Sequence, residues 1–580
     1  MCGIFGIVSQ TEFSSKELVA GLKKLEYRGY DSAGLAMQGD NLYVEKSVGK
    51  VEELEKKLKS VTGKVGISHT RWSTTGAVTL ENAHPHLDCT GEIAVVHNGI
   101  VENYLELKKN LIAKGHKLKS ETDTEVIPHL IEDNLHLGWA NALEETAKLL
   151  EGRNTFLAMR EKNEIAAFKN GSPLIIGMGK DRFFVSSDAL PFLEYTNKTI
   201  FLEDGDLVFI GDKVRFSNGK EPTVQEVEWT AERAQKGAFP HFLIKEIMEQ
   251  PVTLEKSILQ NEEHLREIAT AVTGARGSFF TACGTAGYAA LTASYFFAKI
   301  AQKHVNFCVA SEFPSYKHFL TDKSLVLAFS QSGETADTLD AIAAAKEKNA
   351  KVVGIVNVPS SSQTRQSDHY LLTNAGPEIA VCSTKAFTAQ LSVGLLLAYA
   401  AAGKFEEGKK LLKDTAKNLG ETLNDVYLEK IKSLAKILAK KQHIYVIGKG
   451  FNYPTALEIA LKIKEVSYIH AEGFASGELK HGVITLIEKG TPCIAIIAND
   501  ENKTAVLTGA TEIKARGGYI IGIAPENNAI FDFWIPVPDV GNASPIVNAV
   551  PGQLLAYYLG VELGYDVDFN RNLAKSVTVR

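Results

Sequence analysis

Over residues 2–212, short apolar runs alternate with amphipathic helical patterns. The runs at 92–96 and 165–168 are typical of buried strands, and the patterns at 16–25 and 104–114 predict helices. This mixture predicts an α+β arrangement for the first part of the chain.

From about residue 240 onward the pattern becomes more regular, because apolar strands are followed by helical stretches of about 10–15 residues. Strands in such an alternation run parallel, and helices cover both faces of their sheet. The pattern therefore predicts two doubly wound α/β units. The expected strands lie at 278–282 and 324–329 in the first unit, and at 443–447 and 492–497 in the second.

The hydrophobic periodicity fades between residues 219 and 239, which predicts a linker. The expected domains are therefore 2–218, 240–420 and 421–570. A helix is predicted just after the linker, at 241–250, and Pro251 is expected to end it.

Composition excludes several classes of function. The 580 residues carry a net charge of −6 with both signs interspersed, so neither nucleic acid nor an anionic membrane surface is an expected partner. The most apolar stretch, 391–402, is too short to cross a bilayer, which takes about 20 residues. The six cysteines contain no CxxC pair, which argues against a disulfide framework or a zinc site and favours the cytoplasm.

The first candidate for chemistry is Cys2. Removal of the initiator methionine would leave a thiol and an α-amine on one residue, and such an amine titrates near neutrality and can generate the reactive thiolate. The apolar run 4–8 directly behind it predicts a buried strand that fixes the terminus. A frayed terminus with an accidental cysteine is the alternative.

Three polar loops in the same region have groups that suit an amino-acid substrate. Arg71 can hold a carboxylate through two hydrogen bonds, and the carboxylates of 120–125 can pair with an ammonium group. The side-chain amide of Asn98 beside the backbone N–H of Gly99 is a candidate oxyanion hole. A salt bridge, a turn and a helix cap are the ordinary uses of these residues. Together with Cys2, however, they favour glutamine as the substrate.

The loop 330–335, with sequence SQSGET, joins a predicted strand to a helix expected near residue 336. Backbone N–H groups and the positive end of a helix attract anions, and the loop itself contains no cation. The three hydroxyls exceed what a capped turn needs. The loop therefore predicts a site for a small sugar phosphate rather than for a nucleotide with magnesium.

In the second α/β unit, Glu458, Lys462 and Glu465 share one face of a predicted helix that is apolar nearly all round. A solvated ladder of ion pairs is the commoner use of this spacing. A buried lysine between carboxylates would instead have a perturbed pKa, as groups at functional sites often do. His481 follows, and a lone histidine is more often structural than catalytic.

The first half resembles the N-terminal-nucleophile glutamine amidotransferases, and within them the glucosamine-6-phosphate synthase family. The motifs that carry this resemblance are CGIFG at 2–6, EYRGYDS at 26–32, HTRW at 69–72, NAHPH at 82–86, HNG at 97–99 and TDTE at 122–125. The resemblance implies an αββα glutaminase fold with Cys2 as the nucleophile. It also implies that Asn98 and Gly99 stabilise the oxyanion. The residues that it implies for glutamine are Arg71, Trp72, Thr74 and Asp123, with Trp72 also gating the path of ammonia. Thr75 stands where bacterial members commonly have histidine, which changes local glutamine contacts.

The second half resembles the sugar isomerase units of the same family, through CGT at 283–285, SQSGET at 330–335, STK at 383–385, ELKHG at 478–482 and NLAKSVTV at 572–579. The sugar-phosphate residues that this resemblance implies are Thr285, Ser330, Gln331, Ser332, Thr335, Val381, Ser383 and Ala574. Ala286 replaces a serine common in the family, which removes one sugar contact.

The same resemblance implies roles for the ionisable residues. Glu465 would be the base between sugar C1 and C2, and His481 of a neighbouring subunit would open the ring. Lys575, in a tail at 571–580 that reaches the active sites, would form a Schiff base with the ketose, assisted by Glu458 and Lys462.

The expected protein is thus a homodimeric isomerising aminotransferase that uses glutamine and fructose-6-phosphate, with no metal ion and no organic cofactor. A related amidase–isomerase with another phosphosugar, a deaminase of amino sugar phosphates, and a catalytically silent sugar-phosphate sensor are the alternatives. Cys2 and Lys575 argue against the sensor.

Overall fold

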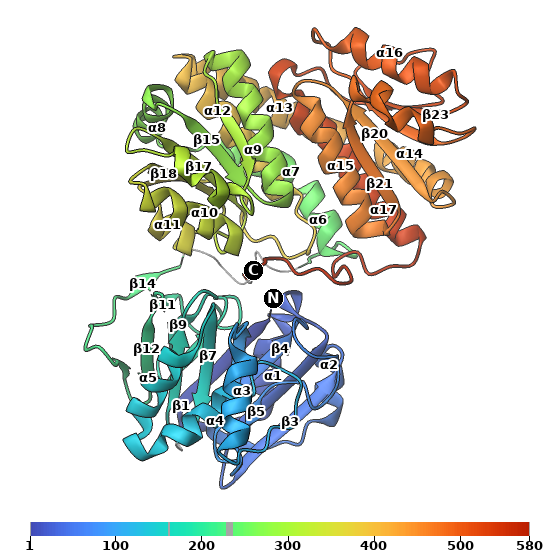
Figure 1. Cartoon of the computed structure of the whole chain (residues 1–580). Coiled ribbons are helices and arrows are strands. Elements are labelled where there is room, and N and C mark those ends of the chain that lie inside the picture. The colour runs from blue at the N-terminus through green and yellow to red at the C-terminus, as the bar shows by residue number, and fades with distance from the viewer. Residues whose placement is uncertain (1, 161–162, 228–235, 579–580) are drawn as a thin grey trace. The chain divides into compact units, whose positions relative to one another are not determined.

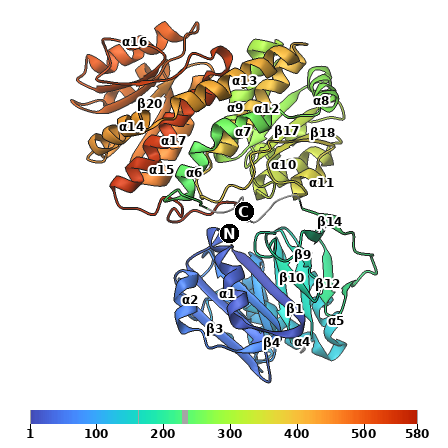
Figure 2. The ribbon, with the colours of Figure 1, turned by 180° about the vertical axis from the view of Figure 1, so that it is seen from behind.

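The computed structural model describes residues 2–160, 163–227 and 236–578. The chain divides into two compact units (Figure 1, Figure 2). The first contains the residues up to Gln235 together with Ala574–Arg580, and the second contains Lys236–Leu573. The tail from Ala574 onward therefore groups with the N-terminal unit, whereas residues 571–573 belong to the second unit.

Two antiparallel sheets form the centre of the first unit. The eight-stranded sheet has the order β14-β11-β9-β10-β1-β4-β2-β3, and the six-stranded sheet has the order β13-β12-β8-β7-β6-β5. The strands of the larger sheet are β1 (Gly3–Ser14), β2 (Ser32–Gln38), β3 (Leu42–Val48), β4 (Thr62–Arg71), β9 (Ile175–Met178), β10 (Arg182–Ser186), β11 (Lys198–Phe201) and β14 (Gln225–Glu226). Those of the smaller sheet are β5 (His86–Leu87), β6 (Ala94–Gly99), β7 (Asn154–Met159), β8 (Ile165–Lys169), β12 (Asp206–Ile210) and β13 (Val214–Phe216).

Alternating side chains of the smaller sheet enter two different cores. In β8, Ile165 and Ala167 pack against the larger sheet, whereas Ala166 and Phe168 pack against helices. A strand buried on both faces has an unbroken apolar sequence, which explains the run at 165–168. The helices outside the smaller sheet are α3 (Tyr104–Ala113), α4 (Val126–Asn134) and α5 (Trp139–Leu149), and those outside the larger sheet are α1 (Ser15–Lys23) and α2 (Val51–Lys57). These layers form the predicted αββα fold.

The second unit contains two parallel five-stranded sheets, ordered β16-β15-β17-β18-β19 and β21-β20-β22-β23-β24. Numbered within each sheet, both have the order 2-1-3-4-5, which confirms two doubly wound units. The strands are β15 (Ser278–Ala282), β16 (Asn306–Val309), β17 (Leu325–Ser330), β18 (Lys351–Val356), β19 (His369–Leu372), β20 (His443–Gly448), β21 (His470–Ala475), β22 (Pro492–Ile496), β23 (Tyr519–Ala524) and β24 (Phe533–Pro536).

Helices cover both faces of each parallel sheet, so their strands also alternate between two cores. Leu325, Leu327 and Phe329 of β17 enter a core shared by the two halves of this unit, whereas Val326 and Ala328 face the other way. The helices of the first half include α8 (Glu262–Gly274), α9 (Gly284–Phe296), α10 (Ala336–Glu347), α11 (Ser362–Gln366), α12 (Lys385–Ala401) and α13 (Phe405–Thr422). Those of the second half are α14 (Asp425–Leu438), α15 (Asn452–Ser467), α16 (Lys503–Lys514) and α17 (Ser544–Glu562).

Three local predictions differ from the structure. Pro251 does not end a helix: α6 (Phe242–Met248) stops earlier, and Pro251 lies in the first turn of α7 (Gln250–Ser257), where its missing N–H costs nothing. Residues 120–125 precede α4 rather than beginning it. Within the expected linker, β14 pairs with β11 and extends the larger sheet, while residues 228–235 lie outside the described part of the chain.

None of the helices among the described residues combines the length and the apolar character that a bilayer crossing requires.

Candidate functional site

The position of Cys2 follows from β1. This strand pairs with β10 on one side and with β4 on the other, and residues 3–8 are buried. The backbone N–H of Trp72 donates to the Cys2 sulfur at 3.3 Å. Burial raises the pKa of the Cys2 thiol. The hydrogen bond from the Trp72 N–H and the charge of Arg71 lower this pKa, but burial outweighs them. A base is therefore needed to form the thiolate at neutral pH.

Asn98 and Gly99 lie at the end of β6, beside Cys2. The Asn98 side-chain amide donates to the backbone carbonyl of Cys2 at 3.1 Å and to the Ser187 hydroxyl at 3.0 Å. Gly99 has φ +143°, and a Cβ at this position would lie 2.0 Å from the Arg153 carbonyl oxygen, so the position requires glycine. Both amide hydrogens of Asn98 already have acceptors, so stabilisation of an oxyanion requires one of these bonds to be exchanged.

Arg71 organises the loop that follows β4. Its guanidinium donates to the backbone carbonyls of Thr75 at 2.5 Å, Ala77 at 3.1 Å and Gly76 at 3.2 Å. Among the described residues, these carbonyls take the place of the ordinary salt bridge that the sequence left open. The charges of Cys2 and Asp123 both act on Arg71, so the structure brings these three predicted residues together.

Asp123 and the two other predicted glutamine residues occupy different environments. Asp123 is buried, and its carboxylate accepts from the backbone N–H of Val101 at 2.8 Å. Trp72 is half-buried and Thr74 is exposed. Asp123 is thus fixed by the fold, whereas Thr74 stands at the surface.

Four buried histidines behind Asn98 were not assigned a role from sequence. Nε2 of His69 donates to Asn98 Oδ1 at 3.1 Å and to the His97 carbonyl at 2.9 Å. The rings of His69 and His84 stack with centroids 4.0 Å apart, and His84 accepts from the His97 N–H. Burial lowers the pKa of His69 to about 3, and also lowers the pKa values of His84, His86 and His97. The neutral His69 ring orients Asn98, and the motifs HTRW, NAHPH and HNG were the available signal.

In the second unit, the candidate phosphate-binding loop 330–335 lies where β17 ends. In a sheet of order 2-1-3-4-5, strands 1 and 3 mark the switch point at which ligands bind. Here these are β15 and β17, so Thr285 and the loop 331–335 share one edge of the sheet. The Ser330 hydroxyl accepts from the N–H of Gly333 at 2.9 Å, and α10 begins directly after Thr335.

The three charged residues of α15 form a buried cluster rather than a solvated ladder. Lys462 is 1% exposed and its Nζ lies 3.5 Å from Oε1 of Glu458, which is fully buried. Lys462 also forms an ion pair with Glu465. Burial raises the pKa of Glu458 to about 8, against the opposing charge of Lys462. Glu458 can therefore carry a proton at neutral pH.

Burial alone would lower the pKa of Lys462. The neighbouring acidic groups Cys382, Glu458 and Glu465 outweigh this effect and hold its pKa well above the ordinary range. Lys462 is therefore a permanent cation, suited to stabilising negative charge beside the two carboxyl groups.

The first half of the unit supplies partners to this cluster. The Thr285 hydroxyl donates to Glu458 at 3.4 Å, and the Cys382 thiol donates to Glu465 at 2.9 Å. Sequence reasoning missed Cys382, although it lies between Val381 and Ser383. Glu378, also missed, accepts from the Ser383 hydroxyl at 2.9 Å and so orients it.

The remaining predicted residues are His481 and two residues of the C-terminal tail. His481 is exposed, at the end of a short 3₁₀ helix. Ala574 and Lys575 belong to the unit that carries Cys2, whereas Glu458, Lys462 and Glu465 belong to the other. Within its unit, Thr578 of the tail is fully buried, and its hydroxyl lies 3.1 Å from that of Ser172.

Family comparisons agree with this division. A model of the glutamine amidotransferase domain matches residues 69–194, and a model of the SIS domain matches residues 273–400 and 437–560. The chain is 42% identical to the isomerising glutamine–fructose-6-phosphate aminotransferases of Thermococcus kodakarensis and Aquifex aeolicus, over the whole of this chain and of each relative. The chain belongs to the isomerising glutamine–fructose-6-phosphate aminotransferase family.

A solved structure of a family member supports the assignment of the second unit. The C-terminal domain of glucosamine-fructose-6-phosphate aminotransferase from Francisella tularensis is 34% identical and matches with a TM-score of 0.54. The match covers 58% of this chain and 99% of that domain. Membership of the family confirms the expected fold class and the duplicated isomerase unit.

The buried histidines predict acid sensitivity. Unfolded His69 takes up a proton below pH about 6.5, whereas folded His69 does so only near 3. Its contribution to stability is therefore complete above pH 6.5 and is lost as the pH falls toward 3. We expect His69→Gln to reduce the pH dependence of the unfolding free energy by about one proton, or about 1.4 kcal/mol per pH unit, in calorimetry between pH 6.5 and 4.

The exposed His136 of the same unit is the matched control. His136→Gln should keep the wild-type slope. Equal slopes in His69→Gln and the wild type would mean that His69 is already protonated in the folded protein.

Proposed function

We propose that the protein converts fructose-6-phosphate and glutamine to glucosamine-6-phosphate and glutamate. The observation that carries this proposal is that one chain has both sets of groups, one around Cys2 and one around Lys462, and is 42% identical to the named aminotransferases over its full length. Neither a glutaminase nor a sugar isomerase alone would need both.

In the glutaminase unit, the Cys2 thiolate attacks the side-chain carboxamide carbon of glutamine. The nitrogen leaves as ammonia, and water then hydrolyses the thioester to glutamate. The α-amine of a processed terminus supplies the base, and Asn98 with Gly99 stabilises the oxyanion. Glutamine is held by Arg71, Trp72, Thr74 and Asp123, with Trp72 gating the release of ammonia.

In the isomerase unit, the sugar phosphate binds at the switch point through neutral donors. The residues that hold it are Thr285, Ser330, Gln331, Ser332, Thr335, Val381 and Ser383, with Ala574 from the tail. This arrangement suits a monophosphate, because hydroxyls, an amide and the N-terminus of α10 supply the donors. The loop 330–335 itself contains no lysine or arginine.

The proton transfers belong to the buried cluster and the tail. His481 opens the ring. Lys575 then forms a Schiff base with the open ketose, and the ketone oxygen leaves as water. Ammonia displaces the lysine amine from the imine carbon, which restores free Lys575. Glu465 moves a proton between C1 and C2, while Lys462 stabilises the developing negative charge and Glu458 carries a proton nearby.

We also propose that the protein acts as a homodimer in the cytoplasm. His481 is exposed in its own subunit, which suits a residue that completes the site of a neighbouring copy.

The proposed reaction is tested by incubating the purified protein with glutamine and fructose-6-phosphate and measuring glutamate and amino sugar separately. Both products should appear in equal amounts. A deaminase would instead consume glucosamine-6-phosphate without releasing glutamate, and a sensor would form neither product.

Cys2→Ala separates the two half-reactions. Glutamine hydrolysis should fall to background, because the variant cannot form the thioester. Amino sugar formation from concentrated ammonia should persist, because none of the groups assigned to the sugar needs the Cys2 thiol. Cys493→Ala, which removes a buried thiol from the second unit, should hydrolyse glutamine like the wild type. Hydrolysis by Cys2→Ala would rule out this nucleophile.

Gly333→Ala tests the phosphate loop. Gly333 has φ +68°, and an added Cβ would lie 2.1 Å from the Ser361 hydroxyl oxygen. We expect the loop to shift and KM for fructose-6-phosphate to rise about tenfold, corresponding to about 1.4 kcal/mol. Gly376→Ala, with φ +72° and open space around its Cβ, adds backbone strain without the clash. Equal KM values in the two variants would contradict a role for the loop.

Lys575→Ala should abolish synthesis with either glutamine or ammonia while basal glutamine hydrolysis remains. Borohydride with fructose-6-phosphate should trap the sugar on the wild type and on Lys489→Ala, an exposed-lysine control, but not on Lys575→Ala. Equal trapping in all three proteins would place the Schiff base on another lysine.

A further inference from the structure

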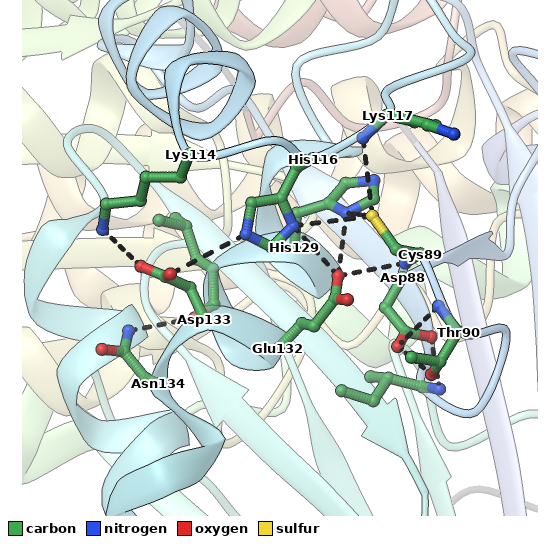
Figure 3. A network of polar contacts seen from close by, with 12 residues as sticks. Asp88, Cys89, Thr90, Lys114, His116, Lys117, His129, Glu132, Asp133 and Asn134 are labelled. Carbon is green, nitrogen blue, oxygen red and sulfur yellow. Dashed lines mark hydrogen bonds and ion pairs between the residues drawn. The ribbon is translucent and has the colours of Figure 1, made fainter.

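Four potential metal ligands converge on the helical side of the first unit, from three segments of the chain (Figure 3). Cys89 follows β5, His116 follows α3, and His129 and Glu132 lie one turn apart on α4. One ligand atom from each residue lies within 4.8 Å of the others. This cluster, which we call the Cys89 cluster, has no part in the proposed reaction.

Four of the six distances between these atoms match the edges of a tetrahedron around zinc, and the other two are at most 4.8 Å. The Cys89 sulfur lies 3.6 Å from Nδ1 of His116 and 3.5 Å from Nδ1 of His129. The Glu132 oxygen Oε2 lies 3.1 and 3.2 Å from the same two nitrogens. Tetrahedral zinc, with bonds of about 2.3 Å to sulfur and about 2.0–2.1 Å to nitrogen and oxygen, requires sulfur–nitrogen edges of about 3.6 Å and nitrogen–oxygen edges of about 3.3 Å.

Glu132 Oε2 is the acceptor that the cluster shares. It faces Nδ1 of both histidines and also accepts from the Cys89 backbone N–H at 3.0 Å. The Cys89 thiol can donate to only one of the two Nδ1 atoms, so at least one imidazole N–H shares this oxygen with the Cys89 N–H. A single cation at the centre would replace the protons that lie between these side chains and leave the Cys89 N–H bond in place.

The charges and the surroundings also suit a divalent ion. A thiolate from Cys89 and the carboxylate of Glu132 would neutralise the two positive charges of a divalent ion. The Lys117 backbone N–H donates to the Cys89 sulfur at 3.4 Å. The Asp133 carboxylate lies 3.8 Å from Nε2 of His116, on the side away from the cluster, as outer carboxylates do around zinc-bound histidines (Figure 3).

We propose that the Cys89 cluster binds one zinc ion with a structural role. Sulfur and imidazole ligands favour zinc over magnesium or calcium, and four protein ligands close the coordination sphere. The absence of a CxxC pair argued against zinc in the sequence, but these ligands come from three separate segments. Only the His129 and Glu132 spacing is local.

The zinc would fasten both ends of the segment that carries Asp123. This segment runs from His116 to His129 and includes Thr124, which hydrogen-bonds to Nδ1 of His97 at 2.9 Å. Zinc would therefore stabilise the placement of Asp123 and of the histidines behind Asn98 without touching the substrate.

The test is the metal content of the full chain, purified without chelator from zinc-supplemented cells. The wild type should hold one zinc per chain, and Cys89→Ser and His129→Gln should lose it. Cobalt substitution of the wild type should give the visible spectrum of a tetrahedral thiolate site, which the two variants lack. His136→Gln and Cys2→Ala, which change an exposed histidine and the reactive thiol, should keep zinc and so exclude binding at those residues.

A second measurement guards against variants that fail to fold. Wild-type protein stripped with a chelator should unfold at a lower temperature, and adding back zinc, but not magnesium, should restore the original value. A wild type with no more zinc than Cys89→Ser, or a stripped protein whose unfolding zinc does not change, would overturn the proposal. Either result is independent of whether the protein makes an amino sugar.

Discussion

The first unit depends on the burial of β1 between β10 and β4. Every residue from Gly3 to Val8 is excluded from solvent by these neighbours, so the chain immediately before Gly3 has little freedom. Gly3 is part of this constraint, because a Cβ there would lie 2.7 Å from the Thr70 hydroxyl oxygen. The pairing of strands therefore places the Cys2 thiol beside the Trp72 N–H and the Cys2 carbonyl beside the Asn98 amide.

The isomerase groups depend on a different constraint, namely the cost of burying charge. Lys462 is a cation withdrawn from water, and its burial is tolerable because the carboxyl groups of Glu458 and Glu465 lie beside it. Thr285 and Cys382 complete the cluster from the first half of the unit, so its geometry depends on the packing of two α/β layers against each other.

Periodicity predicted most of the fold, because strands buried on both faces have unbroken apolar sequences, as at 165–168 and in β17. The prediction from a single residue type was wrong at Pro251, because proline can begin a helix as readily as it can end one. For the site, the motifs singled out Cys2, Arg71, Asn98 and Lys462, but Cys382 and Glu378 act through contacts across the fold, and the Cys89 cluster joins segments that share no local pattern. Such residues have no signature within a single stretch of sequence.

The two halves of the second unit share a strand order but contribute different groups. The first half has the polar loop at its switch point, and the second has the charged face of α15. Because both halves belong to one chain, the meeting of Thr285 and Cys382 with that face is intramolecular, and its extent is independent of protein concentration.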